Sequence, residues 1–144
     1  MTTVPVHDID LVVTLTPLTA LPHDPTVRLS AGRFARATLT PEGAAAVELT
    51  WADGAAHASA HGDGADWLLQ RLPRLLGCSD DVRGFAPTAQ PLRDVWRHHR
   101  GDRIARTGTL WHDLAWFIVQ QRGQTPPGRS AGSRGTSTAP PARP

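Results

Sequence analysis

The amino-acid sequence predicts an α+β protein with a small antiparallel sheet of about five strands and helices, followed by two further helices and a disordered tail. Apolar and polar residues alternate over much of the first sixty residues, which is typical of strands with one buried face. The apolar period changes to that of a helix after Asp63. Residues 123–144 contain no Val, Ile, Leu, Met, Phe or Trp. They cannot offset the entropy lost on ordering, so we expect this tail to be disordered.

The strand signals come from short alternating runs separated by turn residues. The expected strands lie at 10–16, 26–30, 33–40, 44–51 and 55–61. Leu11, Val13 and Leu15 carry the alternation of the first, and a helical turn is expected at 17–21. The last three strands should form an antiparallel meander, because turn residues separate them. One of these turns is Asp53-Gly54, a pair that favours the positive φ angles of a tight hairpin.

Three helices are expected after the strands, at 63–77, 91–101 and 109–122. Pro73 should kink or restart the first, and Gly77 is suited to end it. Pro91 is a favourable first-turn residue for the second helix. The central stretch of the third, 114–119, is apolar on every side, which is typical of a helix enclosed by other helices. We therefore expect this helix to require partners beyond the two other helices.

Composition excludes several classes of function. A length of 144 residues suits one compact domain, with or without a tail, and excludes a two-lobed enzyme. All 15 basic residues are arginines, so a Schiff-base lysine is excluded. Cys78 is the single cysteine, which excludes an internal disulfide and favours a reducing compartment. No segment resembles a signal peptide or a membrane span, so we expect a cytoplasmic protein without membrane contact.

The titratable residues form no recognisable metal or catalytic pattern. His57 and His61 lie four residues apart on a predicted strand, a separation of roughly 13 Å that is too large for one zinc ion. No serine lies in a nucleophile elbow, and the Gly62-Asp63-Gly64 segment lacks the lysine of a phosphate-binding loop. We therefore expect no metal, no cofactor and no catalytic residue in this chain.

Basic charge is concentrated in the second half of the chain. Residues 1–91 carry six arginines and ten acidic residues, whereas residues 92–144 carry nine arginines and three acidic residues. Arg93, Arg97 and Arg100 recur at helical spacing and should line one face of the second helix. Such a row suits bidentate contacts with phosphate groups, and it also suits an ordinary solvated helix face. The sequence leaves both interpretations open.

Three segments share the residues and the spacing of a known family. They are DPTVR at 24–28, LLGCSDDVRGF at 75–85 and RTGTLWHDLAWFIVQQR at 106–122. In this order they resemble the bacterial DNA-3-methyladenine glycosylase II family. The resemblance implies an N-terminal domain with a TBP-like fold, then a linker helix and the first helix of an all-α helix-hairpin-helix glycosylase domain, then a tail without counterpart in the family. The corresponding ranges are 1–87, 88–122 and 123–144.

The resemblance also implies an activity and a partner. Members of the family bind double-stranded DNA that contains alkylated bases, flip the damaged nucleotide out, and hydrolyse its N-glycosidic bond with the help of an Asp carboxylate. In the family, the hairpin and this Asp lie downstream of the helix matching 109–122, and no residue here matches them. Gln121 and Arg122 stand near the position of a side chain that wedges into DNA. Arg122 is equally suited to cap the end of its helix.

Two hypotheses follow. In the first, the chain is the N-terminal part of a base-excision repair glycosylase, shortened by a frameshift or truncation and inactive alone. The family is expected to be monomeric and associated with the nucleoid, whereas an uncovered apolar helix favours self-association or aggregation. In the second, the chain is a stand-alone, non-enzymatic module that binds DNA or another protein through the surface of 110–119.

Overall fold

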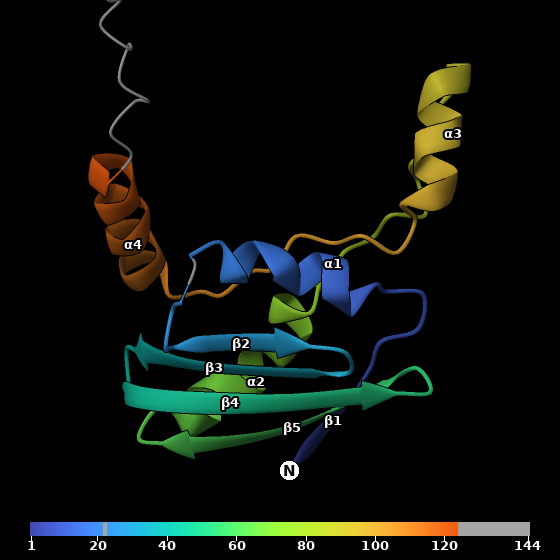
Figure 1. Ribbon diagram of the computed structural model, residues 1–144. Coiled ribbons are helices and arrows are strands. Elements are labelled where there is room, and N and C mark those ends of the chain that lie inside the picture. The colour runs from blue at the N-terminus through green and yellow to red at the C-terminus, as the bar shows by residue number, and fades with distance from the viewer. Residues whose placement is uncertain (22, 124–144) are drawn as a thin grey trace, which may run out of the picture.

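The computed structural model has a five-stranded antiparallel sheet with helices, and it confirms the α+β class predicted from the sequence (Figure 1). It describes residues 1–21 and 23–123, apart from the side chains at 112, 116 and 119–122. The tail that the sequence predicts to be disordered lies, beyond Gly123, outside the described residues.

The sheet has the strand order β1-β5-β4-β3-β2, and every neighbouring pair is antiparallel. The strands are β1 (Thr2–Pro5), β2 (Val27–Ser30), β3 (Arg33–Thr40), β4 (Gly43–Ala52) and β5 (Ala55–Gly62). The predicted meander is confirmed as β3, β4 and β5, and the predicted strand at 26–30 is β2. Asp53 and Gly54 have φ angles of 51° and 76°, so the β4–β5 turn uses the positive values that an Asp-Gly hairpin requires.

The strand predicted at 10–16 is wrong. These residues form α1 (Leu11–Leu15) and the start of a 3₁₀ turn, η1 (Thr16–Thr19), and the remaining sheet position is taken by β1. Leu11 and Leu15 are buried together with Thr14, which is helical rather than strand spacing. Asp10 caps the helix, because its carboxylate accepts a hydrogen bond of 3.0 Å from the Val13 amide. The alternation of apolar residues at 10–16 therefore belongs to a short helix capped by Asp10, not to a strand.

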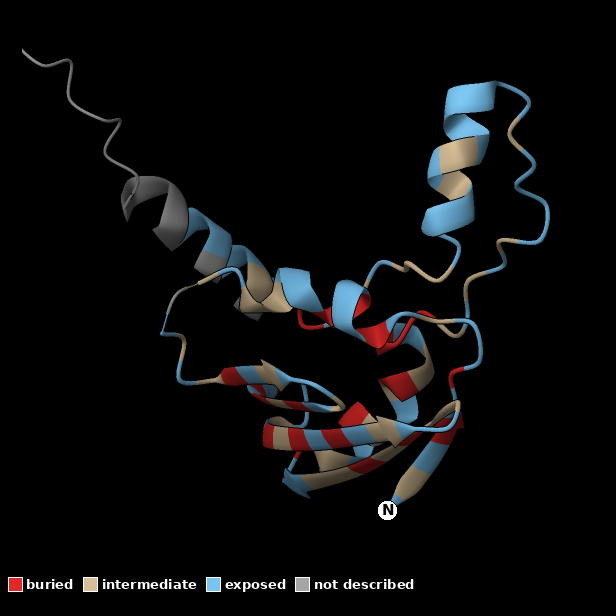
Figure 2. Cartoon of the chain, turned by 45° about the vertical axis from the view of Figure 1, so that its right-hand side comes forward, coloured by how far each residue is buried: buried red, intermediate tan, exposed pale blue. Residues whose placement is uncertain are grey.

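The core lies on one face of the sheet. α2 (Ala65–Leu75) packs across β4, β5 and β1, while α1 and η1 pack against β2. The largest fully buried apolar side chains come from β3, β4 and these helices, and they are Leu15, Phe34, Val47, Leu49, Leu72 and Leu76. Figure 2 shows the resulting alternation of buried and exposed residues along the strands. Burial of each large side chain stabilises the fold by about 1.5–3 kcal/mol.

α2 ends where the sequence predicts, at a glycine in the left-handed region. Gly77 has a φ of +74°, and a Cβ atom there would lie 2.4 Å from the Cβ of Arg103. Glycine is therefore required both by the backbone angle and by the close approach of the later chain. Pro73 lies inside α2 near its end, and the helix is assigned as one continuous element rather than restarting.

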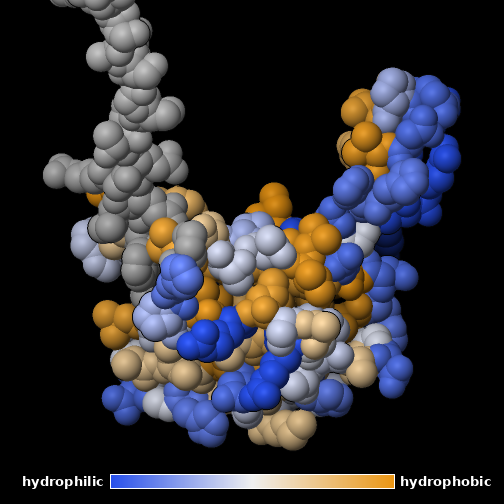
Figure 3. All heavy atoms as spheres, viewed as in Figure 1, coloured by the Kyte–Doolittle hydropathy of each residue, from blue (hydrophilic) through white to orange (hydrophobic). Residues whose placement is uncertain are grey.

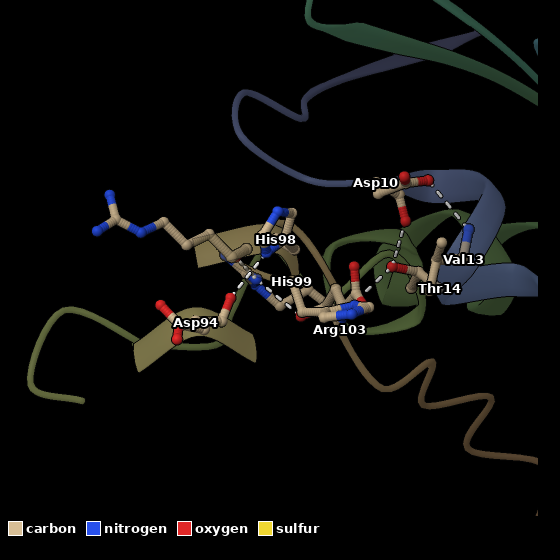
Figure 4. Close-up of polar contacts among 9 residues, drawn as sticks. Asp10, Val13, Thr14, Asp94, His98, His99 and Arg103 are labelled. Atoms are coloured by element: carbon tan, nitrogen blue, oxygen red, sulfur yellow. Dashed lines mark hydrogen bonds and ion pairs between the residues drawn. The ribbon is translucent and has the colours of Figure 1, made fainter. Parts of the chain in front are cut away.

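α3 (Gln90–His98) and α4 (Leu110–Gly123) stand away from the sheet as two separate arms (Figure 1). The chain between them is held to α1 by two hydrogen bonds. The Asp10 amide donates to the Gly101 carbonyl over 2.8 Å. The Arg103 amide donates to the buried Thr14 hydroxyl over 3.3 Å (Figure 4). No helix in the described part of the chain is long and apolar enough to cross a membrane. The predicted division at 87/88 stays a prediction.

Candidate interaction surface

α4 is attached to the sheet domain through a partly buried ion pair. Arg36 of β3 is 9% exposed, and its Nη2 atom lies 2.5 Å from Oδ1 of Asp113 in the first turn of α4. The second oxygen of Asp113 accepts from the Thr107 hydroxyl, and Arg36 also lies 3.4 Å from the buried Thr109 hydroxyl. The Arg36 guanidinium and the Asp113 carboxylate therefore each have a hydrogen-bonding partner in addition to one another. The beginning of α4 is thereby fixed against the inner face of the sheet.

This pair is not among the contacts predicted from the sequence, although the strand pattern contains a signal for it. Arg36 lies between Phe34 and Thr38, both buried, so its position in the alternating strand faces inward. A charged residue is rarely buried without a partner. The strand pattern alone therefore indicates that some acidic residue must reach Arg36. It does not say which, because Asp113 lies 77 positions further along the chain.

A cavity of about 250 Å³ adjoins the ion pair. Its walls come from five parts of the chain: η1 and the residues after it, β2 with the residues before it, β3, the connector before α4, and α4 itself. The apolar wall residues are Pro17, Leu18, Ala20, Leu21, Val27, Ala105 and Phe117. The ion pair of Arg36 and Asp113 also lines the cavity, together with Asp24, Thr26 and Thr107. The cavity is therefore mainly apolar with a few polar groups.

From its first residue onward, α4 exposes large apolar side chains. They are Leu110, Trp111, Leu114, Phe117 and Ile118, which we call the α4 stripe, and each is 44–78% exposed. The sequence predicts that this helix is made to be enclosed, and the described residues 1–109 do not enclose the stripe. Apolar groups also gather on the surface between the two arms (Figure 3), where Val12 and Val13 of α1 and Ile104 are exposed. Exposed apolar surface of this kind usually marks an interface.

The basic row on α3 differs from the prediction at its end. α3 ends at His98, so Arg93 and Arg97 lie on the helix but Arg100 follows it. The helix stops because the chain turns at 99–102, where His99 contacts the Asp102 carboxylate at 2.7 Å and the Asp102 amide donates to the His99 carbonyl. The prediction that three arginines line one face of this helix is therefore wrong for Arg100.

The arginines of α3 make contacts within their own helix. Arg97 pairs with Asp94 at 2.9 Å, and Arg93 donates a hydrogen bond to the Gln90 side chain. Figure 4 shows the neighbouring contact of the His98 ring with the Asp94 carbonyl, at 2.8 Å. All of these side chains are largely exposed to solvent. Exposed pairs of this kind contribute little to stability, so the arginines remain accessible to a polyanion.

Aromatic rings accompany the basic residues. Phe85 and Trp96 contact edge to face with ring centroids 5.0 Å apart, and this contact joins α3 to the segment before it. The Arg71 guanidinium lies 4.1 Å from the Trp67 ring on α2, within the range of a cation–π contact. Phe85 is exposed. The surface around α3 thus combines positive charge with an accessible aromatic side chain.

Gln121 and Arg122 belong to the last turn of α4, but their side chains lie outside the described residues. Their predicted role at DNA stays a prediction. His57 and His61 lie on β5, where the His57 ring contacts the Thr3 hydroxyl at 3.1 Å. Over the described ranges, no group of three or more His, Cys, Asp or Glu residues is arranged to hold a metal ion.

Two ionisable groups near the end of α2 are perturbed. The Arg83 side chain lowers the pKa of the exposed Asp81 carboxyl to about 2, with help from the Arg83 backbone amide. Burial raises the pKa of the Cys78 thiol, which is half-buried. The thiol is therefore held in its neutral, weakly nucleophilic form. Both effects have structural causes that need no bound ligand.

Comparisons of this chain with family models, with curated proteins and with solved structures found no match. The candidate surface consists of an anchored helix with an exposed apolar stripe, an adjoining cavity, and a second arm that carries exposed arginines.

Proposed function

We propose that this chain is the N-terminal part of a base-excision repair protein similar to DNA-3-methyladenine glycosylase II. The observation that carries the proposal is the α4 stripe, because a helix with this much exposed apolar surface is suited to enclosure by further helices. The α+β sheet domain followed by separate helices also supports it. In this interpretation, α3 and α4 begin the all-α domain that binds DNA.

In such an enzyme, the residues of this chain would fix α4 on the sheet and contact the DNA, and they would not take part in the catalytic step. The ion pair of Arg36 and Asp113 fixes the start of α4 on the sheet. Arg93, Arg97 and Arg100 are accessible for contacts with DNA phosphates. Asp113 is engaged by Arg36 and Thr107, so it is not available to stabilise a sugar cation. The base-flipping hairpin and the catalytic Asp would come from another domain, and the chain alone would be inactive.

The proposal is tested by supplying the helical domain separately. A DNA-3-methyladenine glycosylase II enzyme that lacks its own N-terminal domain provides the helix-hairpin-helix part. We expect this chain to bind it, and we expect Leu114→Glu to weaken the complex at least tenfold because a charge would be buried in the apolar contact. Leu39→Glu is the matched control, since Leu39 is 61% exposed on the opposite face of the sheet.

Activity provides the second readout. The purified chain should release no methylated base from duplex DNA, since no residue matches the catalytic Asp. Base release by the chain alone would contradict the proposal that the catalytic Asp comes from another domain. Failure of the helical domain to bind, under conditions where Leu39→Glu and the unmodified chain are both folded, would reject the proposal.

The alternative is a stand-alone DNA-binding module, favoured by the exposed arginines and the neighbouring Phe85 and Trp96. This alternative predicts duplex binding without any other domain. The logarithm of the affinity should then fall linearly with that of the salt concentration. Arg93→Gln and Arg100→Gln should each reduce the slope by about one phosphate contact. Binding that is absent at low salt would exclude this alternative.

A further inference from the structure

Among the residues of α4 whose side chains the structure describes, the large exposed apolar ones are arranged symmetrically about Leu114. At 3.6 residues per turn, the five positions of the α4 stripe fall within a band about 120° wide, so they form one continuous face. Leu114 is the central position. Trp111 and Phe117 lie three residues before and after it, and Leu110 and Ile118 lie four residues before and after it. The pattern therefore reads the same in both directions along the helix.

We propose that the α4 stripe pairs with the same stripe of a second copy of this chain, with the two helices antiparallel about a two-fold axis at Leu114. In this arrangement Leu114 faces its own copy. Trp111 faces Phe117 of the second copy, and Leu110 faces Ile118. A two-fold interface must be self-complementary, and here every position of the α4 stripe meets another apolar position of the stripe.

The surroundings of the stripe favour this occupant. Asp113 is directed toward Arg36, so two α4 helices that meet along their stripes bring no described like charges together. Phe117 lines the cavity of about 250 Å³, and the bulky Trp111 of the second copy would lie at its mouth. Residues 124–144 of the same chain cannot replace the second copy, because they contain no large apolar side chain.

The size of the stripe sets the expected strength. Trp and Phe bury roughly 150–250 Å² each when fully enclosed, and Leu and Ile bury less, so the exposed fractions of these five offer less than about 600 Å² per copy. A standard stable interface uses about 800 Å² per partner. We therefore expect a weak dimer with a dissociation constant on the order of 10–100 µM.

Sedimentation velocity over a range of concentrations tests the proposal. The average mass should rise from 15.5 kDa and level off at twice that value. Leu114→Glu should keep the chain monomeric at concentrations where the unmodified chain is dimeric, because it places two carboxylates opposite each other. Leu92→Glu is the matched control, since Leu92 is 56% exposed on the other arm, and it should leave the dimer unchanged.

Mixing variants tests the register. Equal amounts of Leu114→Glu and Leu114→Arg should restore the dimer, because position 114 then carries opposite charges across the axis. Leu110→Arg and Ile118→Glu should each weaken the dimer alone and restore it when mixed, which keeps the test decisive if one substitution at 114 prevents folding. Circular dichroism checks that every variant is folded.

Three outcomes would overturn the proposal. They are an unmodified chain that stays monomeric well above the expected dissociation constant, a Leu114→Glu chain that still dimerises, and growth past twice the chain mass without levelling off. The helical domain of the proposed repair function and the second copy would cover the same stripe, so they exclude each other on one chain, and an excess of the helical domain should dissociate the dimer. A monomeric chain would leave the proposed repair function standing, because that function is tested by binding of the helical domain.

Discussion

The ion pair between Arg36 and Asp113 should govern how firmly α4 is attached. Asp113→Ala removes the carboxylate and leaves a guanidinium whose side chain is only 10% exposed without a counter-charge. Removing one partner of a fully buried pair costs about 3–5 kcal/mol. The Asp113 side chain is 24% exposed, and water that enters its place offsets part of the loss. We therefore expect a cost of about 2–3 kcal/mol.

This cost should appear locally rather than in the whole fold. Arg36 regains solvent when α4 leaves the sheet, so detachment of the helix relieves the uncompensated charge. Backbone amides of α4 should then exchange hydrogen for deuterium roughly 30- to 150-fold faster, as the energy converts at about 1.4 kcal/mol per factor of ten. Amides in the centre of β4 should keep their exchange rates, because they lie in the core of the sheet.

A double-mutant cycle supplies the control. Arg36→Met combined with Asp113→Ala should recover much of the loss, giving a coupling energy of about 2 kcal/mol. The pair of Arg33 and Glu48 involves the same strand, but its side chains are 61% and 51% exposed, so its coupling should be below about 1 kcal/mol. The reasoning is refuted if α4 exchange is unchanged in Asp113→Ala, or if both pairs show equal coupling.

Further predictions concern the segment after α2. Gly77→Ala should destabilise the chain by more than about 1 kcal/mol in urea unfolding, because of its positive φ and close contact, whereas Gly84→Ala should be near neutral with open space around it. The Asp81 carboxyl should titrate at about 2 by NMR and return toward 3.8 in Arg83→Gln; its depressed pKa means that the contact stabilises the fold above pH 3.8 and is lost as the pH falls toward 2. Unfolding in urea should speed the reaction of Cys78 with iodoacetamide at neutral pH, because its raised pKa results from burial; equal rates in folded and unfolded chains would contradict this.

The elements that could be predicted are those specified by residues close together in the sequence. The meander of β3, β4 and β5 followed from alternation and turn residues, and Gly77 marked the end of α2. The segment 10–16 is a helix rather than the predicted strand, because the five residues of α1 are too few to distinguish a helical from a strand period when apolar residues also occupy outward positions. The capping contact of Asp10 with Val13 decides in favour of a helix there.

The candidate surface was predicted in part. The apolar surplus of 110–119 is visible in the sequence, because composition alone reveals a helix that a small chain cannot enclose. The basic row was overestimated, since the spacing of Arg93, Arg97 and Arg100 assumes a helix that continues past His98. The turn that ends α3 depends on the contact of His99 with Asp102 and on the attachment of the following residues to α1.

The sequence by itself determined that this protein has an antiparallel sheet, later helices and one helix that is apolar on every side. These properties depend on period, turn chemistry and composition, which act over a few residues. Only the tertiary structure decided that Arg36 meets Asp113, that α4 therefore turns its stripe outward, and that a cavity forms beside Phe117. Contacts between distant segments depend on how the whole chain packs, and no local pattern specifies them.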